Sequence, residues 1–411
     1  MRFKIFFATF APPLRSSRLK ALPTQSIVFF NYCGPAIAAI RFRHSFLTLA
    51  GGVAMASTVA GTSLAVSSSE RTNFRIQISV ALILALGIAS FFWLDSRYPA
   101  LLKKLHSGTA IKTSGVLSFD AKLPVAPQMP LPTRIERTTI NWMWTNRIGM
   151  TFSLFFGAAV LSLLPLLPSR RFRSAAANTA LGAITGVPLG VCANCVAPIG
   201  QSLYEGGASS TTVLATMISS PMLNLIVLTM VFALFPPEVA LLRVAVPILL
   251  LVSVPWLVGE TKPVELQCQV PSVGWLVPAA GTVKQYLKNL ARLAATTIPL
   301  MILAALLGAI VAELIPSQAI PTHVSFLGIV LVAVAGAFLP VPMAFDVAAA
   351  FILMTRGVPL PYVATLLCTL GAFSVYPMLI VGRTMSWRTS VRMFAAVVTL
   401  GILSGVAIAL L

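Results

Sequence analysis

Long hydrophobic runs separated by short polar stretches fill most of the sequence after residue 75. The first run covers about 76–94, and several runs exceed the roughly 20 residues that span a bilayer as a helix. Eight more follow in two sets of four: about 148–168, 177–203, 211–235 and 239–258, then about 290–314, 324–354, 360–382 and 391–411. The short alternating strands of a transmembrane β-barrel do not occur in this pattern. We therefore expect an all-α, polytopic membrane protein.

Polar stretches divide this pattern into six regions. The basic region before the first run contains either a targeting segment or an additional apolar segment. Two polar connections follow, a proline-containing loop and a linker between the two sets of runs. The expected regions are 1–75 (basic), 76–94 (transmembrane helix), 95–140 (loop), 141–258 (first four-segment unit), 259–289 (linker) and 290–411 (second four-segment unit).

The two four-segment units resemble each other. Adding 150 to the residue numbers of the first unit nearly reproduces the second. At this offset GVPLGVCANCVAPIGQSLYEGG, which begins at Gly186, lies over GAFLPVPMAFDVAAAFILMTRG, which begins at Gly336, without a gap. Few positions are identical, so the comparison depends on the order and length of the segments. Internal duplication of this kind is typical of secondary transporters.

The second segment of each unit contains residues that interrupt a helix. In the first unit these are Gly186, Pro188 and Gly190, and in the second they are Pro340 and Pro342. Backbone groups freed at such breaks need partners within the protein or in a wet cavity. Paired breaks at corresponding places point to a transport site, although a proline kink without function fits the same residues.

The basic residues favour an inverted arrangement of the two units. If each broken segment returns to the side where it started, each unit crosses the membrane three times. Most basic residues of the short loops then share one side, as the positive-inside rule favours: Arg170, Arg171, Arg173, Lys262, Lys284, Lys288, Arg383, Arg388 and Arg392. The basic residues of the 95–147 loop then fall on the opposite side, against the positive-inside rule. This conflict is smaller if each broken segment crosses the membrane fully, but the other basic residues are then divided less clearly between the two sides.

Composition agrees with a membrane location. Of the 411 residues, 57% are hydrophobic and 9% are charged, whereas about a quarter of the residues in soluble domains are charged. The net charge is +19. The basic residues cluster in loops beside apolar segments, where they can contact anionic lipid headgroups, and we do not expect nucleic-acid binding. No phosphate-binding Gly-Lys-Ser/Thr run occurs, so ATP hydrolysis is not expected. We expect a multi-pass protein of the cell (inner) membrane whose partners are the bilayer and a small substrate.

Residues 191–228, VCANCVAPIGQSLYEGGASSTTVLATMISSPMLNLIVL, resemble the predicted-permease family that includes organoarsenical efflux permeases. The family signature has a cysteine, a proline six residues later, a glycine and a closing Ser-Pro-x-x-Asn. The positions here that match it are Cys192, Pro198, Gly207, Pro221 and Asn224. The four-plus-four layout extends the resemblance to about residues 140–411.

Two positions depart from that signature. The second cysteine of the family falls on Asn194, with Cys195 where a small residue is usual, and Leu225 follows Asn224 in place of a proline. The resemblance implies a permease rather than an enzyme, with no cofactor and a small substrate. Its finer implication is efflux of a thiophilic metal or organometalloid. No bound metal and no oligomeric state is predicted.

Cys192 and Cys195 are the first candidates for substrate contact. At positions i and i+3 of a helix they share a face, and thiols are soft ligands for thiophilic metals and metalloids. Two small packing residues at a tight helix crossing, or thiol redox chemistry, would fit the pair as well. Asn194 and Pro198 lie in the same segment and belong to the candidate site.

Asp346 is the strongest anomaly, because a carboxylate deep in an apolar segment is costly unless it faces a cavity or is protonated. It is our candidate for proton coupling; a neutral acid bonded to a carbonyl at the break is the alternative. Pro221 interrupts the third segment of the first unit, where Asn224 lines the cavity or bonds across helices. Ser374 occupies the corresponding place in the second unit.

Two other functions remain open. A transmembrane thiol–disulfide conductor also uses duplicated helices with a cysteine beside prolines. It needs a cysteine in each half, and the residue that matches Cys192 in the second unit is Pro342. A membrane assembly factor makes no distinctive demand on the sequence.

Overall fold

The computed structural model describes residues 68–99, 102, 122–167, 172–258, 276–314 and 323–411. These residues are helical with no strand among them, which confirms the all-α prediction for this part of the chain. All of them belong to one compact unit, Ala65–Leu411. Almost all of the expected basic region, residues 1–75, lies outside the described residues.

The helices of the first half begin with α1 (Ser68–Phe92), which continues into a π-helical turn, Trp93–Arg97. The following helices are α3 (Leu131–Leu163), α4 (Ala175–Gly186), α5 (Ala193–Glu205), α6 (Ser210–Met222), α7 (Leu225–Leu234) and α8 (Pro237–Leu257). Those of the second half are α9 (Leu276–Leu314), α10 (Phe326–Phe338), α11 (Phe345–Thr355), α12 (Leu360–Thr369), α13 (Val375–Thr384) and α14 (Trp387–Leu410).

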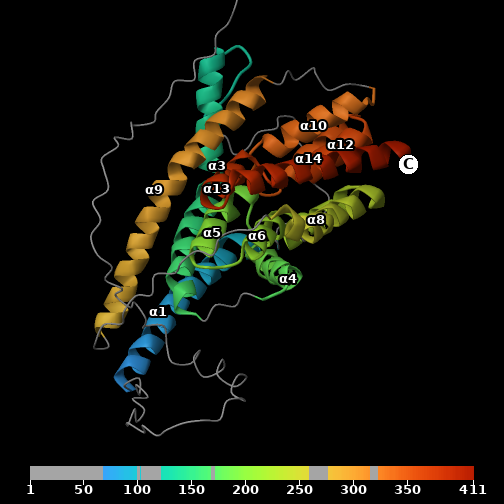
Figure 1. Ribbon diagram of the computed structural model, residues 1–411. Helices are drawn as coiled ribbons and strands as arrows, with labels where there is room; N and C mark the ends of the chain where they lie inside the picture. The colour runs from blue at the N-terminus through green and yellow to red at the C-terminus, as the bar shows by residue number, and fades with distance from the viewer. Residues whose placement is uncertain (1–67, 100–101, 103–121, 168–171, 259–275, 315–322) are drawn as a thin grey trace, which may run out of the picture. The chain divides into compact units, whose positions relative to one another are not determined.

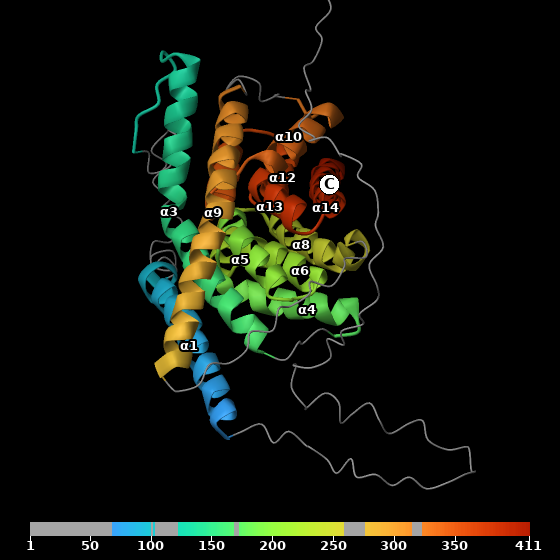
Figure 2. The same cartoon turned by 60° about the vertical axis from the view of Figure 1, so that its left-hand side comes forward.

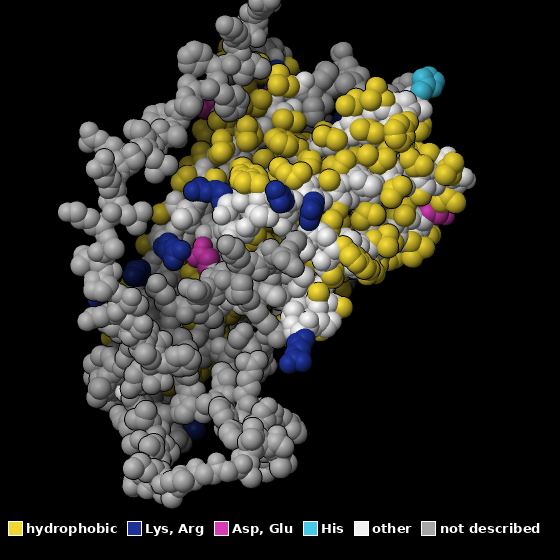
Figure 3. All heavy atoms as spheres, viewed as in Figure 1, with side chains coloured by type: hydrophobic (Ala, Val, Ile, Leu, Met, Phe, Trp, Pro, Cys, Tyr) yellow, Lys and Arg dark blue, Asp and Glu magenta, His cyan; other side chains and the backbone are white. Residues whose placement is uncertain are grey.

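Five of the described helices are long and apolar enough to cross a membrane: α1, α3, α8, α9 and α14. Helices α6 and α7 make a sixth if they are one span, bent by 42° at a short break. Large hydrophobic side chains face outward on these helices, including Ile83, Trp256 and Leu403. Figure 3 shows the resulting hydrophobic surface over α8, α10 and α14. The chain is therefore an integral, multi-pass membrane protein.

Two expected boundaries differ from the structure. Residues 131–140, expected as loop, form the first turns of α3, and residues 276–289, expected as linker, belong to α9. Both stretches are polar because they extend two long helices beyond their apolar parts. Near the start of α3, Arg134 forms an ion pair with Glu313 near the end of α9. Thr138 donates a hydrogen bond to the same carboxylate at 2.8 Å.

The helices around the breaks pack in three groups. Figures 1 and 2 show α3 and α9 side by side, with α4, α6 and α8 packed together and α10, α12 and α14 packed together. Helix α5 packs against α3, α6 and α13. Most of the residues of α5 are buried, so the segment that starts at the first break runs through the interior of the protein.

Candidate functional site

The first break separates α4 from α5. The chain leaves α4 at Gly186, makes a 3₁₀ turn that contains Pro188, and takes a left-handed φ of 58° at Gly190. Glycine adopts this conformation without the penalty that a Cβ imposes. At Gly186 a Cβ would collide with α6, so this glycine also permits close packing. Cys192 then caps α5, where its sulfur accepts a hydrogen bond from the Cys195 N–H at 3.2 Å.

Side chains from α6 and the end of α1 satisfy the backbone of this first break. The indole Nε1 of Trp93 donates to the Pro188 carbonyl at 2.9 Å. The Ser220 hydroxyl contacts both the N–H and the carbonyl of Val191, at 3.3 and 3.4 Å. These backbone groups at the turn therefore have hydrogen-bond partners within the protein, as a membrane segment requires.

The second break separates α10 from α11 and contains Pro340 and Pro342. The indole Nε1 of Trp142 donates to the Pro340 carbonyl at 2.8 Å. The Asn194 amide donates to the carbonyl of Val341 at 2.9 Å. Side chains of α3 and α5 thus hold the backbone of the second break.

Three of the predicted site residues are polar side chains at the ends of helices beside the breaks. Asn194 is fully buried and, besides its bond to the second break, accepts a hydrogen bond from the Ser374 hydroxyl at 2.9 Å. Ser374 stands immediately before α13. Asn224 caps α7 by accepting from the Ile226 N–H at 2.9 Å, and its amide lies 3.3 Å from the Met343 sulfur.

A space of about 10 Å³ lies between the two breaks, close to the minimum for one water molecule. Its walls come from both breaks and from the ends of α6 and α12: Cys192, Ala193, Pro221, Val341, Pro342, Met343, Ala344, Asp346 and Gly371. Of the predicted substrate contacts, Cys192 lines this space. The other five, which lie around it or deeper in the helices, do not: Asn194, Cys195, Pro198, Asn224 and Ser374.

Cys192 and Cys195 are joined by a disulfide, and both side chains are buried. A disulfide offers no thiolate, so the pair can bind a soft metal or metalloid only after reduction. Within the described part of the chain, no group of three or more His, Cys, Asp or Glu side chains could hold a metal ion.

Asp346 has a cationic partner that we did not predict. A guanidinium nitrogen of Arg243 lies 2.5 Å from Asp346 Oδ2, and the other donates to the Leu367 carbonyl at 2.5 Å. Both side chains are almost completely buried. Asp346 is therefore paired with a cation within the apolar segments. Arg243 interrupts the apolar run of α8, and an ionisable residue inside a membrane segment usually has such a partner.

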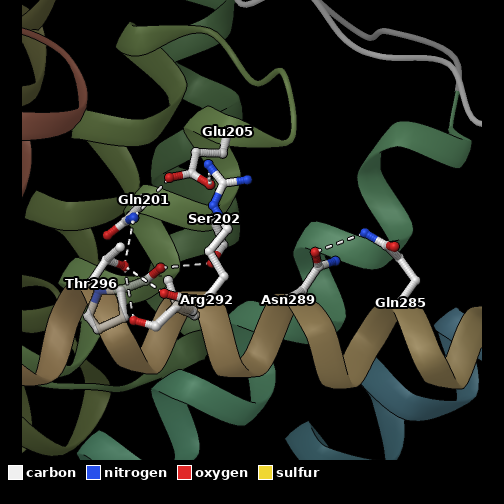
Figure 4. Close-up of polar contacts among 9 residues, drawn as sticks. Gln201, Ser202, Glu205, Gln285, Asn289, Arg292 and Thr296 are labelled. Carbon is white, nitrogen blue, oxygen red and sulfur yellow. Dashed lines mark hydrogen bonds and ion pairs between the residues drawn. The ribbon is translucent and has the colours of Figure 1, made fainter.

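A larger cavity, of about 340 Å³, lies between α5, α9 and α13. Figure 4 shows Gln201 and Glu205 of α5 facing Arg292 and Thr296 of α9. The Gln201 amide donates to Glu205 at 2.8 Å and to the Thr296 hydroxyl at 3.4 Å, and Arg292 lies 3.4 Å from the Glu205 carboxylate. The sequence pattern did not reveal this cavity, because its polar residues come from segments far apart in the chain.

A family model described as a predicted permease matches residues 158–410, which is more than half of the chain. No curated protein and no solved structure matches the sequence.

Proposed function

Because the chain belongs to the predicted-permease family, we propose that it is a secondary transporter whose substrate site lies where its two broken segments meet. The observation that carries this proposal is the position of Asn194. It begins the segment after the first break, bonds to Val341 in the second and accepts from Ser374 of a third helix. Transporters with paired discontinuous helices bind their substrates where those helices meet.

Matching helix boundaries support a duplicated architecture. Helices α6, α7 and α8 start at residues 210, 225 and 237, and α12, α13 and α14 start at residues 360, 375 and 387. Each pair differs by 150, the offset predicted from the sequence. Gly207 and Gly357, which follow the broken segments, both have a positive φ, 94° and 81°.

Contacts at the helix ends support an inverted arrangement of the two units. Gly206, at the end of α5, packs against Leu164 at the end of α3, as expected if the first broken segment returns to the side where it started. The Tyr362 hydroxyl of α12 donates to the His323 carbonyl just before α10, as expected if the second segment returns as well. The ion pair between Arg134 and Glu313 makes α3 and α9, the first helices of the two units, antiparallel.

The chemistry of the two breaks favours efflux of a thiophilic metal or organometalloid with coupling to protons. Reduced Cys192, at the wall of the small cavity, supplies a soft ligand. Protonation of Asp346 would neutralise it and release Arg243 from its ion pair. A buried pair that can exist in two states is the kind of element that coupling requires.

The disulfide itself favours a second candidate, a transmembrane thiol–disulfide conductor. Cys192 and Cys195 form the required pair in the first half. In the second half, Pro342 occupies the matching position, and Cys368, the free cysteine among the described residues, is buried. A conductor would pass through a mixed disulfide at Cys192, which a permease has no need to form.

A strain lacking the gene, with and without complementation, separates these functions when exposed to metalloids, heavy metals and thiol compounds. We expect the deletion to raise sensitivity to trivalent organoarsenicals, and the wild type and Cys195→Ser, but not Cys192→Ser, to restore resistance. A response to thiol compounds alone, with a mixed disulfide trapped at Cys192, would support the conductor. If the deletion changes sensitivity to none of the three classes of compound, the efflux proposal is wrong.

A further inference from the structure

The larger cavity and the two breaks lie along the same pair of helices. At one end of this pair, Asn194 of α5 is hydrogen-bonded to Ser374 at the start of α13. At the other end, Gln201 of α5 and Ile380 of α13 line the cavity. Six residues separate Ser374 from Ile380, which corresponds to about 9 Å along a helix. The cavity thus lies about two helical turns from the proposed substrate site along these helices.

Tyr376 lies between the cavity and the breaks. It stands one turn from Ile380 toward Ser374 and is completely buried. Its hydroxyl lies beside the Thr297 side chain but makes no hydrogen bond of normal geometry. Tyr376 does not line the cavity, and no residue lines both the cavity and the small space at the breaks.

The charged groups around the cavity leave a net positive charge. Its lining includes two arginines, Arg292 and Arg383, and one carboxylate, Glu205. Arg292 lies 3.4 Å from that carboxylate, which the Gln201 amide also contacts. Arg383 is exposed and forms no ion pair with any described residue. One guanidinium is thus available for a ligand.

We infer that this cavity is a vestibule that binds a small molecule through its anionic group, with Arg383 as the principal contact. A volume of about 340 Å³ falls within the range of small-molecule sites. A guanidinium binds carboxylate, phosphate and similar oxygen anions through paired N–H donors. The anionic group belongs either to a free solute or to a lipid headgroup. The role as an entrance to the transport site rests on the proposed function; anion binding does not.

A thiol placed in the cavity tests the inference. Thr384 lines the cavity, and Thr384→Cys introduces a thiol with little change in size. The variant, in phosphatidylcholine nanodiscs, is treated with an anionic and a cationic methanethiosulfonate reagent of similar size, and labelling is followed by intact mass. Each rate is divided by the rate of that reagent with a free thiol, and the chain without the substitution reports the reaction of its native cysteines.

The anionic reagent should label Thr384→Cys roughly tenfold faster than the cationic one, because a nearby unpaired positive charge acts on the two in opposite directions. Adding Arg383→Gln should remove most of this preference. Arg388→Gln is the matched control, because Arg388 is an exposed arginine near the same helix end that does not line the cavity. It should change the preference by less than about twofold, as expected for a more distant, screened charge.

Two further conditions identify the source of the anion. Inorganic phosphate should slow labelling if the site takes free anions, and phosphatidylglycerol in the nanodisc should slow it if a lipid headgroup occupies the site. Protection by either, lost in Arg383→Gln, supports the inference. Equal labelling by the two reagents, or a preference that survives Arg383→Gln, would overturn it. Transport is not measured, so this result and the fate of the proposed transport function are independent.

Discussion

Both breaks leave backbone carbonyls without helical partners, but the side chains that satisfy them come from different parts of the chain. At the first break, Trp93 and Ser220 act within the first half. At the second break, Trp142 and Asn194 reach across from the first half to Pro340 and Val341. The second break therefore depends on the first half for its geometry, whereas the first break is satisfied within its own half.

The chemistry of the two breaks differs in the same way. The first presents a cysteine pair and no charge, and the second presents a carboxylate paired with Arg243 and no cysteine. Cys192 and Asp346 nevertheless line one small space. In the proposed function, one break supplies a soft ligand and the other an ionisable group.

Removing the anion of the buried charge pair is expected to have the largest effect. Asp346→Asn leaves the Arg243 guanidinium buried without its anion, which should destabilise the protein by about 3–5 kcal/mol. It also removes the proposed proton site, so transport should be lost. Thermal unfolding in detergent and substrate accumulation in everted vesicles measure the two effects separately.

The double variant Arg243→Gln, Asp346→Asn distinguishes a structural from a mechanistic role. Without either charge, most of the lost stability should return, because no unpaired ion remains buried. Transport should stay absent. Normal transport by this double variant would show that the pair serves the fold alone.

Asn194→Leu should have a smaller effect, a loss of about 2 kcal/mol, because it leaves the Val341 carbonyl and the Ser374 hydroxyl without their partner. Ser374→Ala removes one of these bonds and should cost about 1 kcal/mol. Denaturant unfolding of both variants compares them. Equal losses would mean that Asn194 does not join the two breaks.

The smallest predicted difference concerns two tryptophans. Trp142→Phe removes a buried hydrogen bond to Pro340 and should cost about 1 kcal/mol. Trp93→Phe removes a more exposed bond to Pro188 and should cost less than about 0.5 kcal/mol. Thermal unfolding in the same detergent measures both. A larger loss of stability in Trp93→Phe than in Trp142→Phe would contradict the proposal that the second break depends on the first half.

The positions of the breaks could be predicted because proline and glycine act through the local backbone. Pro188, Gly190 and Pro340 all lie where the helices end. The partners of the polar residues could not be predicted in this way. Arg243 and Asp346 are 103 residues apart, and an arginine in an apolar run carries no mark of the residue that it meets.

The extents of α3 and α9 were also underestimated, for a related reason. Hydrophobic periodicity marks the part of a helix that is buried in protein or lipid, and polar turns beyond it resemble loops. Residues 131–140 are polar but helical, and Arg134 in this stretch is paired with Glu313 on the neighbouring helix. The sequence left the disulfide between Cys192 and Cys195 open, since the spacing alone is compatible with packing, ligand binding and redox chemistry.

Transport by purified protein in proteoliposomes tests the central claim, that the two breaks form one substrate site with a soft ligand at Cys192. Uptake of methylarsonous acid is measured with reduced and oxidised protein. The reduced wild type should transport, the disulfide form should not, and Cys195→Ser should transport whether or not oxidant is added. Cys192→Ser should lose at least about tenfold in rate, or about 1.4 kcal/mol. Undiminished transport by Cys192→Ser would contradict the account and leave packing as the role of the cysteine pair.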